Sequence, residues 1–190
     1  MTQRVLYLIC CAAPPALRIS MLIGKAQERG WDTCLVCTPT AARWLEADLP
    51  GLERQTAHPV RSQYKLPRQP DVLPDADAML VAPATSNTIN KWASGISDTL
   101  ALGLITEAIG KRLPIITLPY LNDAQAAHPA FAGNVALLRS AGVTVLLGED
   151  GYVPHGPGKG KLDDYPWDLP LEKLSQVAAR DNPGIRGTQS

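Results

Sequence analysis

Short, almost continuously hydrophobic runs recur along the chain and are separated by longer segments with a different apolar spacing. Runs of this kind are typical of parallel strands in a sheet that is covered on both faces. On this basis the sequence predicts strands at Val5–Ile9, Thr33–Cys37, Ala78–Ala82, Pro114–Leu118 and Val143–Leu147.

The segments between these runs carry apolar residues at the three- and four-residue intervals of amphipathic helices. The first is Ala16–Ala26, and Gly30 follows it as a helix stop signal. Two others are Leu100–Ile109 and Phe131–Ala141, and a last helix is expected after Tyr165–Leu169. This alternation of strands and helices predicts an α/β fold with a doubly wound parallel sheet in three layers.

Two segments interrupt the alternation. The proline-rich stretch Gly51–Pro74 is predicted to be a long connection, and long ordered loops often carry function. The glycine- and proline-rich residues 148–161 are predicted to form a mobile flap, and residues 181–190 a flexible tail. With 190 residues the chain has the size of one domain, which we expect to span residues 1–180.

The charge balance narrows the range of partners. The chain has 18 lysine and arginine residues and 18 aspartate and glutamate residues. It therefore has no net positive charge that would attract nucleic acid. No apolar run approaches the roughly 20 residues of a membrane span. The sequence passes from Met1 into the first predicted strand without the long apolar region and cleavage site of a signal peptide, which favours a cytoplasmic location.

The cysteines raise the question of a metal site, because Cys34 and Cys37 have CxxC spacing. Both fall within a predicted strand, where residues three apart face opposite sides and cannot share a zinc ion. We therefore expect no metal, and we interpret Cys34 as a small buried hydrophobe. Cys10, Cys11 and Cys37 come near predicted strand ends, where they could approach a ligand.

The end of the third predicted strand is the most informative stretch. Its residues are Pro83, Ala84, Thr85, Ser86, Asn87 and Thr88. Open parallel sheets bind ligands at the carboxyl ends of their strands, beside the amino ends of helices. Serine, threonine and asparagine are also preferred helix caps, so spacing alone leaves a ligand loop and a capped turn as equal alternatives.

Three blocks of the chain resemble motifs of one family. Pro83–Thr88 resembles the PASANT motif of the homo-oligomeric flavin-containing cysteine decarboxylases, which include phosphopantothenoylcysteine decarboxylase and the lantibiotic decarboxylases. Leu118–Asn122 is similar to the start of the family's PxMNxxMW motif, with Leu121 in place of Met, and Cys37–Ala42 is similar to its strand-end threonine block. The resemblance favours the ligand loop and implies a Rossmann/flavodoxin-like fold that binds FMN.

The resemblance also implies which residues would hold FMN. The family's first turn cradles the phosphate at a helix start, and small residues at the matching positions let the backbone approach closely. Arg18 could pair with the phosphate or be an ordinary solvated residue, and Thr38 and Thr40 could reach the flavin or cap the following helix. The expected cofactor-binding residues are Cys11, Ala12, Ala13, Arg18, Thr38, Thr40, Pro83, Ala84, Thr85, Ser86, Asn87 and Thr88.

The residues expected at the reaction centre match the family only in part. The family's histidine base falls at Gln69, and a glutamine cannot accept a proton at neutral pH. His58 on the long connection is therefore the candidate base, and His128 is its rival, although its place at a helix start favours capping. Asn122 is retained, and in the family this asparagine contacts the substrate carboxylate. The family's flap cysteine has no counterpart in residues 148–161.

These features predict an FMN-binding flavoprotein that resembles oxidative decarboxylases of cysteine-containing peptides or small molecules with a carboxylate. Two alternatives stay open: a flavoprotein of the same fold with another redox or FMN-carrier role, and a non-catalytic partner subunit. The resemblance further implies a homo-oligomer, a trimer or a multiple of one, because the family's sites form between subunits. Neither nucleic acid nor a membrane is an expected partner.

Overall fold

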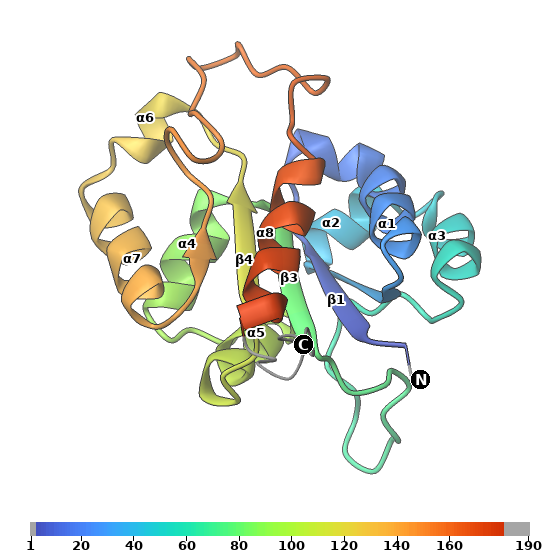
Figure 1. The fold of residues 1–190 in the computed structure, drawn as a ribbon. Helices are drawn as coiled ribbons and strands as arrows, with labels where there is room; N and C mark the ends of the chain where they lie inside the picture. Colours follow the sequence, from blue (N-terminus) through green and yellow to red (C-terminus); the bar gives the residue numbers. More distant parts are fainter. Residues whose placement is uncertain (1–2, 181–190) are drawn as a thin grey trace, which may run out of the picture.

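A parallel five-stranded sheet with helices on both faces forms the protein (Figure 1). The computed structural model describes residues 3–180, so the tail expected at 181–190 lies outside the described residues. The strands are β1 (Val5–Cys10), β2 (Asp32–Cys37), β3 (Ala78–Ala84), β4 (Ile115–Pro119) and β5 (Thr144–Val145). Their order in the sheet is β2-β1-β3-β4-β5, the flavodoxin-like arrangement, which confirms the predicted doubly wound α/β fold.

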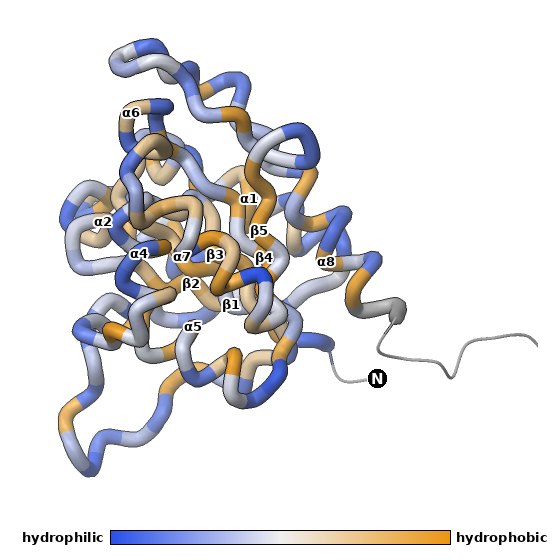
Figure 2. The backbone as a smooth tube through the Cα atoms, turned by 90° about the vertical axis from the view of Figure 1, so that its left-hand side faces the viewer, coloured by the Kyte–Doolittle hydropathy of each residue, from blue (hydrophilic) through white to orange (hydrophobic). Residues whose placement is uncertain are grey.

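The central strands are buried because helices cover both of their faces. Every residue of β1 is buried, and Leu8 lies opposite Leu35 of β2 and Leu80 of β3. The tube in Figure 2 shows the hydrophobic strands inside and hydrophilic segments outside. A strand buried on both faces gains nothing from alternating polar residues, which explains the continuous apolar runs in the sequence.

Helical segments connect the strands much as the apolar spacing predicts. The expected helix Ala16–Ala26 is divided in two, because Pro14–Arg18 forms a 3-10 turn before the regular helix begins. The elements are η1 (Pro14–Arg18), α1 (Ile19–Glu28), α2 (Pro39–Trp44), α3 (Leu49–Thr56), α4 (Ser86–Ala93), α5 (Leu100–Gly110), α6 (Asp123–Ala126), α7 (Pro129–Ser140) and α8 (Asp168–Arg180). In Figure 1, α1 and α8 lie in front of the sheet, and α4 and α5 lie behind it.

Two boundaries differ from the prediction. The stretch Gly51–Pro74 is not one long loop, because α3 includes its first residues and buries Leu52 and Thr56. The irregular connection to β3 therefore begins at Ala57, which has a left-handed backbone, and in Figure 1 it extends below the sheet. The last strand, β5, keeps only two of the five predicted residues, and the following Leu147 instead forms a bridge with Tyr152.

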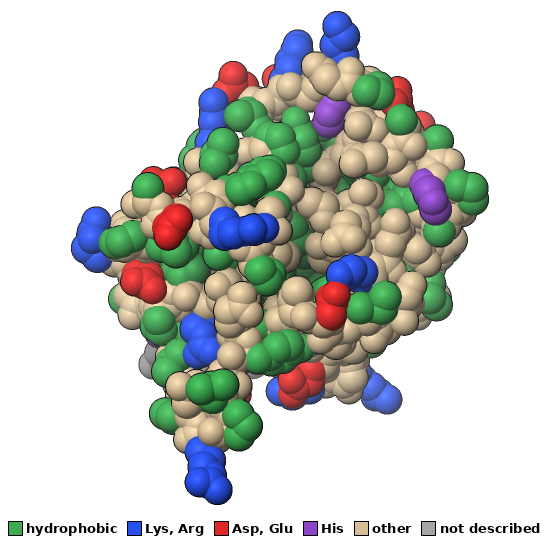
Figure 3. All heavy atoms as spheres, turned by 180° about the vertical axis from the view of Figure 1, so that it is seen from behind, with side chains coloured by type: hydrophobic (Ala, Val, Ile, Leu, Met, Phe, Trp, Pro, Cys, Tyr) green, Lys and Arg blue, Asp and Glu red, His purple; other side chains and the backbone are tan. Residues whose placement is uncertain are grey.

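The surface carries charges of both signs. Figure 3 shows lysine, arginine, aspartate and glutamate side chains scattered over the rear face, with hydrophobic side chains between them. Among the helices of residues 3–180, none combines the length and the apolar character that a bilayer-crossing segment requires.

The start of α8 is fastened to α1 by ion pairs. Lys25 Nζ and Arg29 Nη2 lie 2.7 and 3.0 Å from the two carboxylate oxygens of Asp168. The hydrogen bond from Lys25 is the main reason why the pKa of the Asp168 carboxyl is lowered; desolvation opposes it, and the hydrogen bond from Arg29 lowers the pKa further. These contacts join residues more than 130 positions apart and hold the last helix against the first.

We expect Asp168→Asn to lower the free energy of unfolding by up to about 1 kcal/mol at pH 7, since the carboxylate is half exposed. The folded-state pKa is lowered, so this stabilisation is present above the unfolded value of about 3.9 and is lost as the pH falls through the folded value. Urea unfolding at pH 7 and pH 3 measures the difference. Asp150→Asn, at an exposed position, is the control, and a gap between wild type and Asp168→Asn that is as large at pH 3 as at pH 7 would contradict the assignment.

Candidate functional site

The carboxyl ends of the central strands form a continuous edge. Beyond the regular pairing, the Cys11 N–H donates to the Pro83 carbonyl at 3.1 Å and joins the end of β1 to β3. The Tyr120 N–H donates to the Ala84 carbonyl at 2.8 Å and joins the end of β4 to β3. In this order β2 lies on one side of β1, and β3, β4 and β5 lie on the other, so the order of the strands reverses between β1 and β3. Ligands of open α/β sheets bind at such a reversal point.

The turn after β1 is tied to the start of α4. The Cys11 side chain is 1% exposed, and burial raises the pKa of its thiol to about 11, against hydrogen bonds with the Thr88 side chain and the Thr85 backbone. Ala12 is half-buried and Ala13 is buried, so this turn carries only small side chains. Cys11 and Thr88, both expected to contact a cofactor, thus form part of the floor of the site.

The turn after β3 presents the amino end of α4. Thr85 caps this helix: its Oγ1 accepts a hydrogen bond from the Thr88 N–H at 3.2 Å and lies 3.0 Å from Thr88 Oγ1. Ser86 and Asn87 follow in the first helical turn, where backbone N–H groups lack intrahelical partners. Asn87 is exposed, while Pro83 and Ala84 are buried in the strand end. Thr85 therefore takes the capping role, while the ligand role of this loop stays a prediction.

The turn after β2 is also capped. Thr38 Oγ1 accepts from the Ala41 N–H at 3.4 Å, which is the capping role that the sequence left open, and Thr40 is exposed and accepts from Arg43. Beside this turn, Cys10 and Cys37 face each other in the sheet register and are fully buried. The hydrogen bond to Cys37, followed by burial, raises the pKa of the Cys10 thiol well above its ordinary value.

Arg18 reaches the segment that directly follows the flap. Its guanidinium forms an ion pair with Asp163, a residue 145 positions later in the chain. The Arg18 side chain is 41% exposed and that of Asp163 is 82% exposed, so the pair is a surface contact that other anions can compete for.

Asn122 begins α6 and meets the flap. Its Oδ1 accepts from the Gln125 N–H at 2.8 Å and its own N–H donates to Gln125 Oε1 at 3.1 Å, which forms a capping box. The next residue, Asp123, donates its N–H to the His155 carbonyl at 2.9 Å, so that Asn122 and His155 form a backbone bridge. The capping box uses the carboxamide oxygen of Asn122 and does not involve its NH₂ group.

Aromatic side chains of the flap and of the segment that follows it pack against this edge of the sheet. We call them, together with one residue after β4, the aromatic cluster, and its members are Tyr120, Tyr152, His155, Tyr165 and Trp167. The Tyr120 ring centroid lies 5.2 Å from that of Tyr152 and 5.0 Å from that of His155. Burial raises the pKa of Tyr152 to about 12 and that of Tyr165 well above its ordinary value, so both phenols stay protonated at neutral pH.

The three histidines lie in different parts of the molecule. His58 Nε2 is 2.8 Å from Asp32 Oδ1 at the beginning of β2, so within one chain His58 lies at the amino edge of the sheet, opposite to Asn122. His128 caps α7 and its Nδ1 accepts from the Ala130 N–H at 3.2 Å. Only His155 lies beside Asn122.

The sequence analysis assigned no role to His155. No local motif marks this residue, and the available signal was its place in a segment already expected to close over the site. Gln69, at the family position of the base, lies on the exposed connection, where its side chain accepts from the Leu66 N–H at 2.8 Å.

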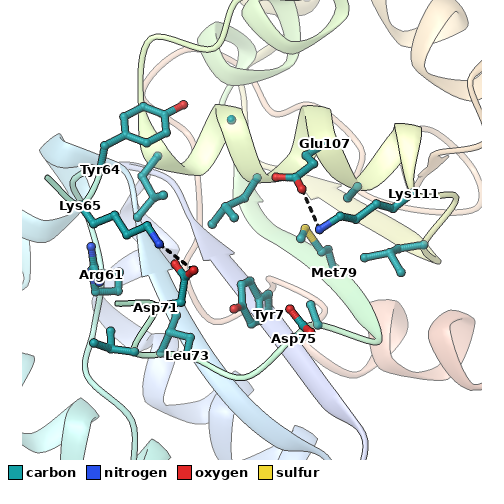
Figure 4. A pocket seen from close by; sticks show the side chains of 17 residues that line it. Tyr7, Arg61, Tyr64, Lys65, Asp71, Leu73, Asp75, Met79, Glu107 and Lys111 are labelled. Carbon is teal, nitrogen blue, oxygen red and sulfur yellow. Dashed lines mark ion pairs between the residues drawn. The ribbon is translucent and has the colours of Figure 1, made fainter. Parts of the chain in front are cut away.

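A large cavity lies elsewhere in the molecule. It has a volume of about 670 Å³ and lies between α5 and the connection before β3, with Tyr7 and Met79 on its floor (Figure 4). Two ion pairs line it, Lys65–Asp71 at 2.6 Å and Lys111–Glu107 at 2.7 Å. None of the expected site residues contributes to its walls. Within residues 3–180 no group of three metal-ligating side chains is close enough to hold a metal ion.

Comparison with known proteins identifies a family and individual relatives that match most or part of this chain. Residues 1–167 match the flavoprotein family. A cysteine/cysteine sulfinic acid decarboxylase from an unknown prokaryotic organism is 35% identical over 101 residues, 53% of this chain. The coenzyme A biosynthesis bifunctional protein CoaBC of Bacillus subtilis is 28% identical over 166 residues, 83% of this chain. The chain spans 27% and 39% of the length of these two relatives.

A solved structure shares the fold over almost the full chain. The FMN-dependent cysteine decarboxylase TvaF from thioviridamide biosynthesis superposes with a TM-score of 0.73 at 21% identity. The match covers 94% of this chain and 99% of TvaF.

The pair between Arg18 and Asp163 predicts how firmly the flap is held. We expect Arg18→Ala and Asp163→Ala each to raise amide hydrogen exchange of residues 158–164 by about twofold to fivefold, the range of an exposed ion pair. The control is Lys161→Ala, since its ammonium is 4.0 Å from Asp164 and both groups are largely exposed. Equal exchange in all three variants and the wild type would show that the pair does not hold the flap.

Proposed function

The chain belongs to the flavoprotein family, and we propose that it binds FMN at the carboxyl edge between β1 and β3 and decarboxylates a thiol-bearing carboxylate. The substrate class is a peptide or small molecule that ends in a cysteine-like group. The observation that carries the proposal is the meeting of the turns after β1, β2 and β3 at the reversal point of the sheet.

The residues of this edge fit a flavin nucleotide. The phosphate is an anion, and the N–H groups of Ser86 and Asn87 at the start of α4 are suited to an anion, as is the positive end of the helix dipole. Ala12 and Ala13 leave room for the close approach of a phosphate to the turn after β1. Arg18 and Thr38 complete the proposed phosphate- and flavin-binding residues. Arg18 is paired with an exposed carboxylate and can exchange this carboxylate for a phosphate.

Bound FMN supplies a two-electron acceptor, and the chain supplies the groups that orient the substrate. The carboxamide NH₂ of Asn122 donates to the substrate carboxylate, consistent with its place beside the flap. The aromatic cluster excludes water from the side of the site that faces β4. A dry, oriented carboxylate is the form that loses carbon dioxide most readily, because water no longer stabilises its charge.

A second candidate is a flavoprotein of the same fold with another redox role or an FMN-carrier role. It is favoured by the position of Gln69 on an exposed loop and of His58 at the opposite edge of the sheet. The absence of cysteine from the flap residues 148–161 also favours it. Reduction of bound FMN by a thiol-bearing carboxylate, with release of carbon dioxide, separates the two candidates.

We include a homo-oligomer, a trimer or a multiple of one, in the proposal. Large apolar side chains at the η1–α1 and α2 segments are exposed: Leu17 is 56%, Met21 45% and Trp44 48% accessible. Apolar side chains of this size on neighbouring helical segments are suited to contact with a second copy of the chain.

We expect FMN to co-purify and Asn87→Ala to weaken FMN binding by about tenfold or more, since Asn87 is exposed in the first turn of α4. Flavin absorbance and fluorescence titration measure this. The matched control is Asn90→Ala on the same helix: Asn90 Oδ1 accepts from Asn134 Nδ2 at 2.8 Å, so its loss lowers stability and leaves FMN affinity unchanged. A colourless protein that fails to bind added FMN would refute the cofactor.

We expect Asn122→Ala to weaken binding of a thiol-bearing carboxylate such as N-acetyl-L-cysteine by about tenfold to a hundredfold, while FMN content is unchanged. Titration calorimetry of the FMN-loaded protein measures the affinity. Gln125→Ala is the control, because it removes the other half of the capping box and leaves the Asn122 carboxamide in place. If both variants lose the same affinity, Asn122 acts only through the helix cap.

A further inference from the structure

We propose that His155 of the flap accepts the proton of the substrate thiol, in place of the base that the family carries on the connection before β3. This inference rests on the proposed function and names a residue for its proton transfer. A histidine is suited to the task because it exchanges protons near neutral pH.

The position of His155 separates it from the other histidines. His58 is paired with Asp32 at the amino edge, and His128 is used as the cap of α7. His155 forms a backbone bridge with Asn122, the residue proposed to hold the substrate carboxylate. In a cysteine-like substrate the carboxylate and the thiol are separated by three bonds, so a group beside Asn122 is within reach of the sulfur.

Tyr152 orients the imidazole. Its Oη lies 2.5 Å from His155 Nδ1. Burial, followed by the nearby Tyr120, raises the pKa of Tyr152 to about 12, so the phenol stays neutral and its oxygen remains able to accept a hydrogen bond. When Nδ1–H donates to this oxygen, Nε2 carries a free lone pair, and the same hydrogen bond stabilises the imidazolium that forms after protonation.

Gly160 packs directly beside Nε2 of His155. A Cβ at position 160 would lie 2.7 Å from His155 Nε2 and would also collide with the Tyr120 hydroxyl. Nε2 and the Tyr120 hydroxyl therefore lie together against position 160, in a contact that only a glycine allows. Burial raises the pKa of Tyr120, so its hydroxyl stays protonated and is available to donate to the substrate sulfur once that sulfur has lost its proton.

The step balances with FMN as the oxidant. The thiol S–H bond breaks and its proton goes to His155 Nε2, while hydride leaves the neighbouring carbon for FMN and a C=S bond forms. The bond to the carboxylate carbon then breaks, carbon dioxide leaves, and the electron pair becomes an enethiolate. The enethiolate takes the proton back from the imidazolium, so His155 returns to its starting state.

The test uses the FMN-loaded protein under anaerobic conditions, with N-acetyl-L-cysteine as the probe. We expect His155→Asn to keep its FMN and to bind the S-methyl derivative, which has no thiol proton, within about threefold of the wild type. Flavin bleaching by N-acetyl-L-cysteine should slow by about a hundredfold or more. His128→Asn is the matched control and should bleach at the wild-type rate.

A second pair of variants tests the geometry without removing the imidazole. Gly160→Ala should slow bleaching by displacing His155 and Tyr120. Gly156→Ala should have no effect, because its Cβ would meet only Lys159 Cγ at an ordinary 3.6 Å. In the flavin-free protein, NMR should show the ring signals of His155 shifting on addition of N-acetyl-L-cysteine while those of His58 stay in place.

The outcomes are distinct. Wild-type rates in His155→Asn, or ring signals of His155 that do not respond to the probe, would overturn the role of His155 and leave the proposed function standing. An FMN-loaded wild type that N-acetyl-L-cysteine does not reduce would refute the proposed reaction and the inference with it.

Discussion

Backbone hydrogen bonds just beyond the regular strand pairing hold the strand ends in one row, and every part of the site depends on them. The bond from Cys11 to Pro83 fixes the turn after β1 against β3, and the bond from Tyr120 to Ala84 fixes the end of β4. Because these are main-chain contacts, they constrain the turns whatever side chains the turns carry. The turns can therefore keep small residues, which leave room for a ligand without loss of order.

The two edges of the sheet have separate tasks. At the amino edge, His58 pairs with Asp32, and the Asp77 carboxylate accepts from the Val5 N–H at 2.7 Å, so charged groups there fasten the connections. At the carboxyl edge the aromatic cluster closes over the strand ends, and the Tyr165 hydroxyl donates to the Leu118 carbonyl at 2.7 Å. A histidine pairs with a carboxylate at one edge and with a tyrosine hydroxyl at the other, so the position of a histidine decides its surroundings.

The sequence predicts what depends on local pattern. The strands were predicted from apolar runs, because a strand that is buried on both faces is apolar along its whole length. The turn Pro83–Thr88 was predicted because its signal lies within a few consecutive residues. Helix α3 was not predicted, because a proline and a glycine lie in its first turn. Tertiary burial of Leu52 stabilises this helix, and the local sequence does not show that burial. The place of His155 depends on a bridge to Asn122, 33 residues earlier, and no spacing rule in the flap reveals such a pairing.

The burial of all four cysteines has a practical consequence for the study of motion in this protein. Each thiol is at most 1% exposed, and together they lie in β1, the turn after it and β2. A thiol reagent can reach them only when this half of the sheet opens, so the alkylation rate counts opening events of the native state without an introduced probe. Mass spectrometry resolves each modified cysteine, and the four rates together would report whether the edge strand β2 separates alone or the central strand opens with it.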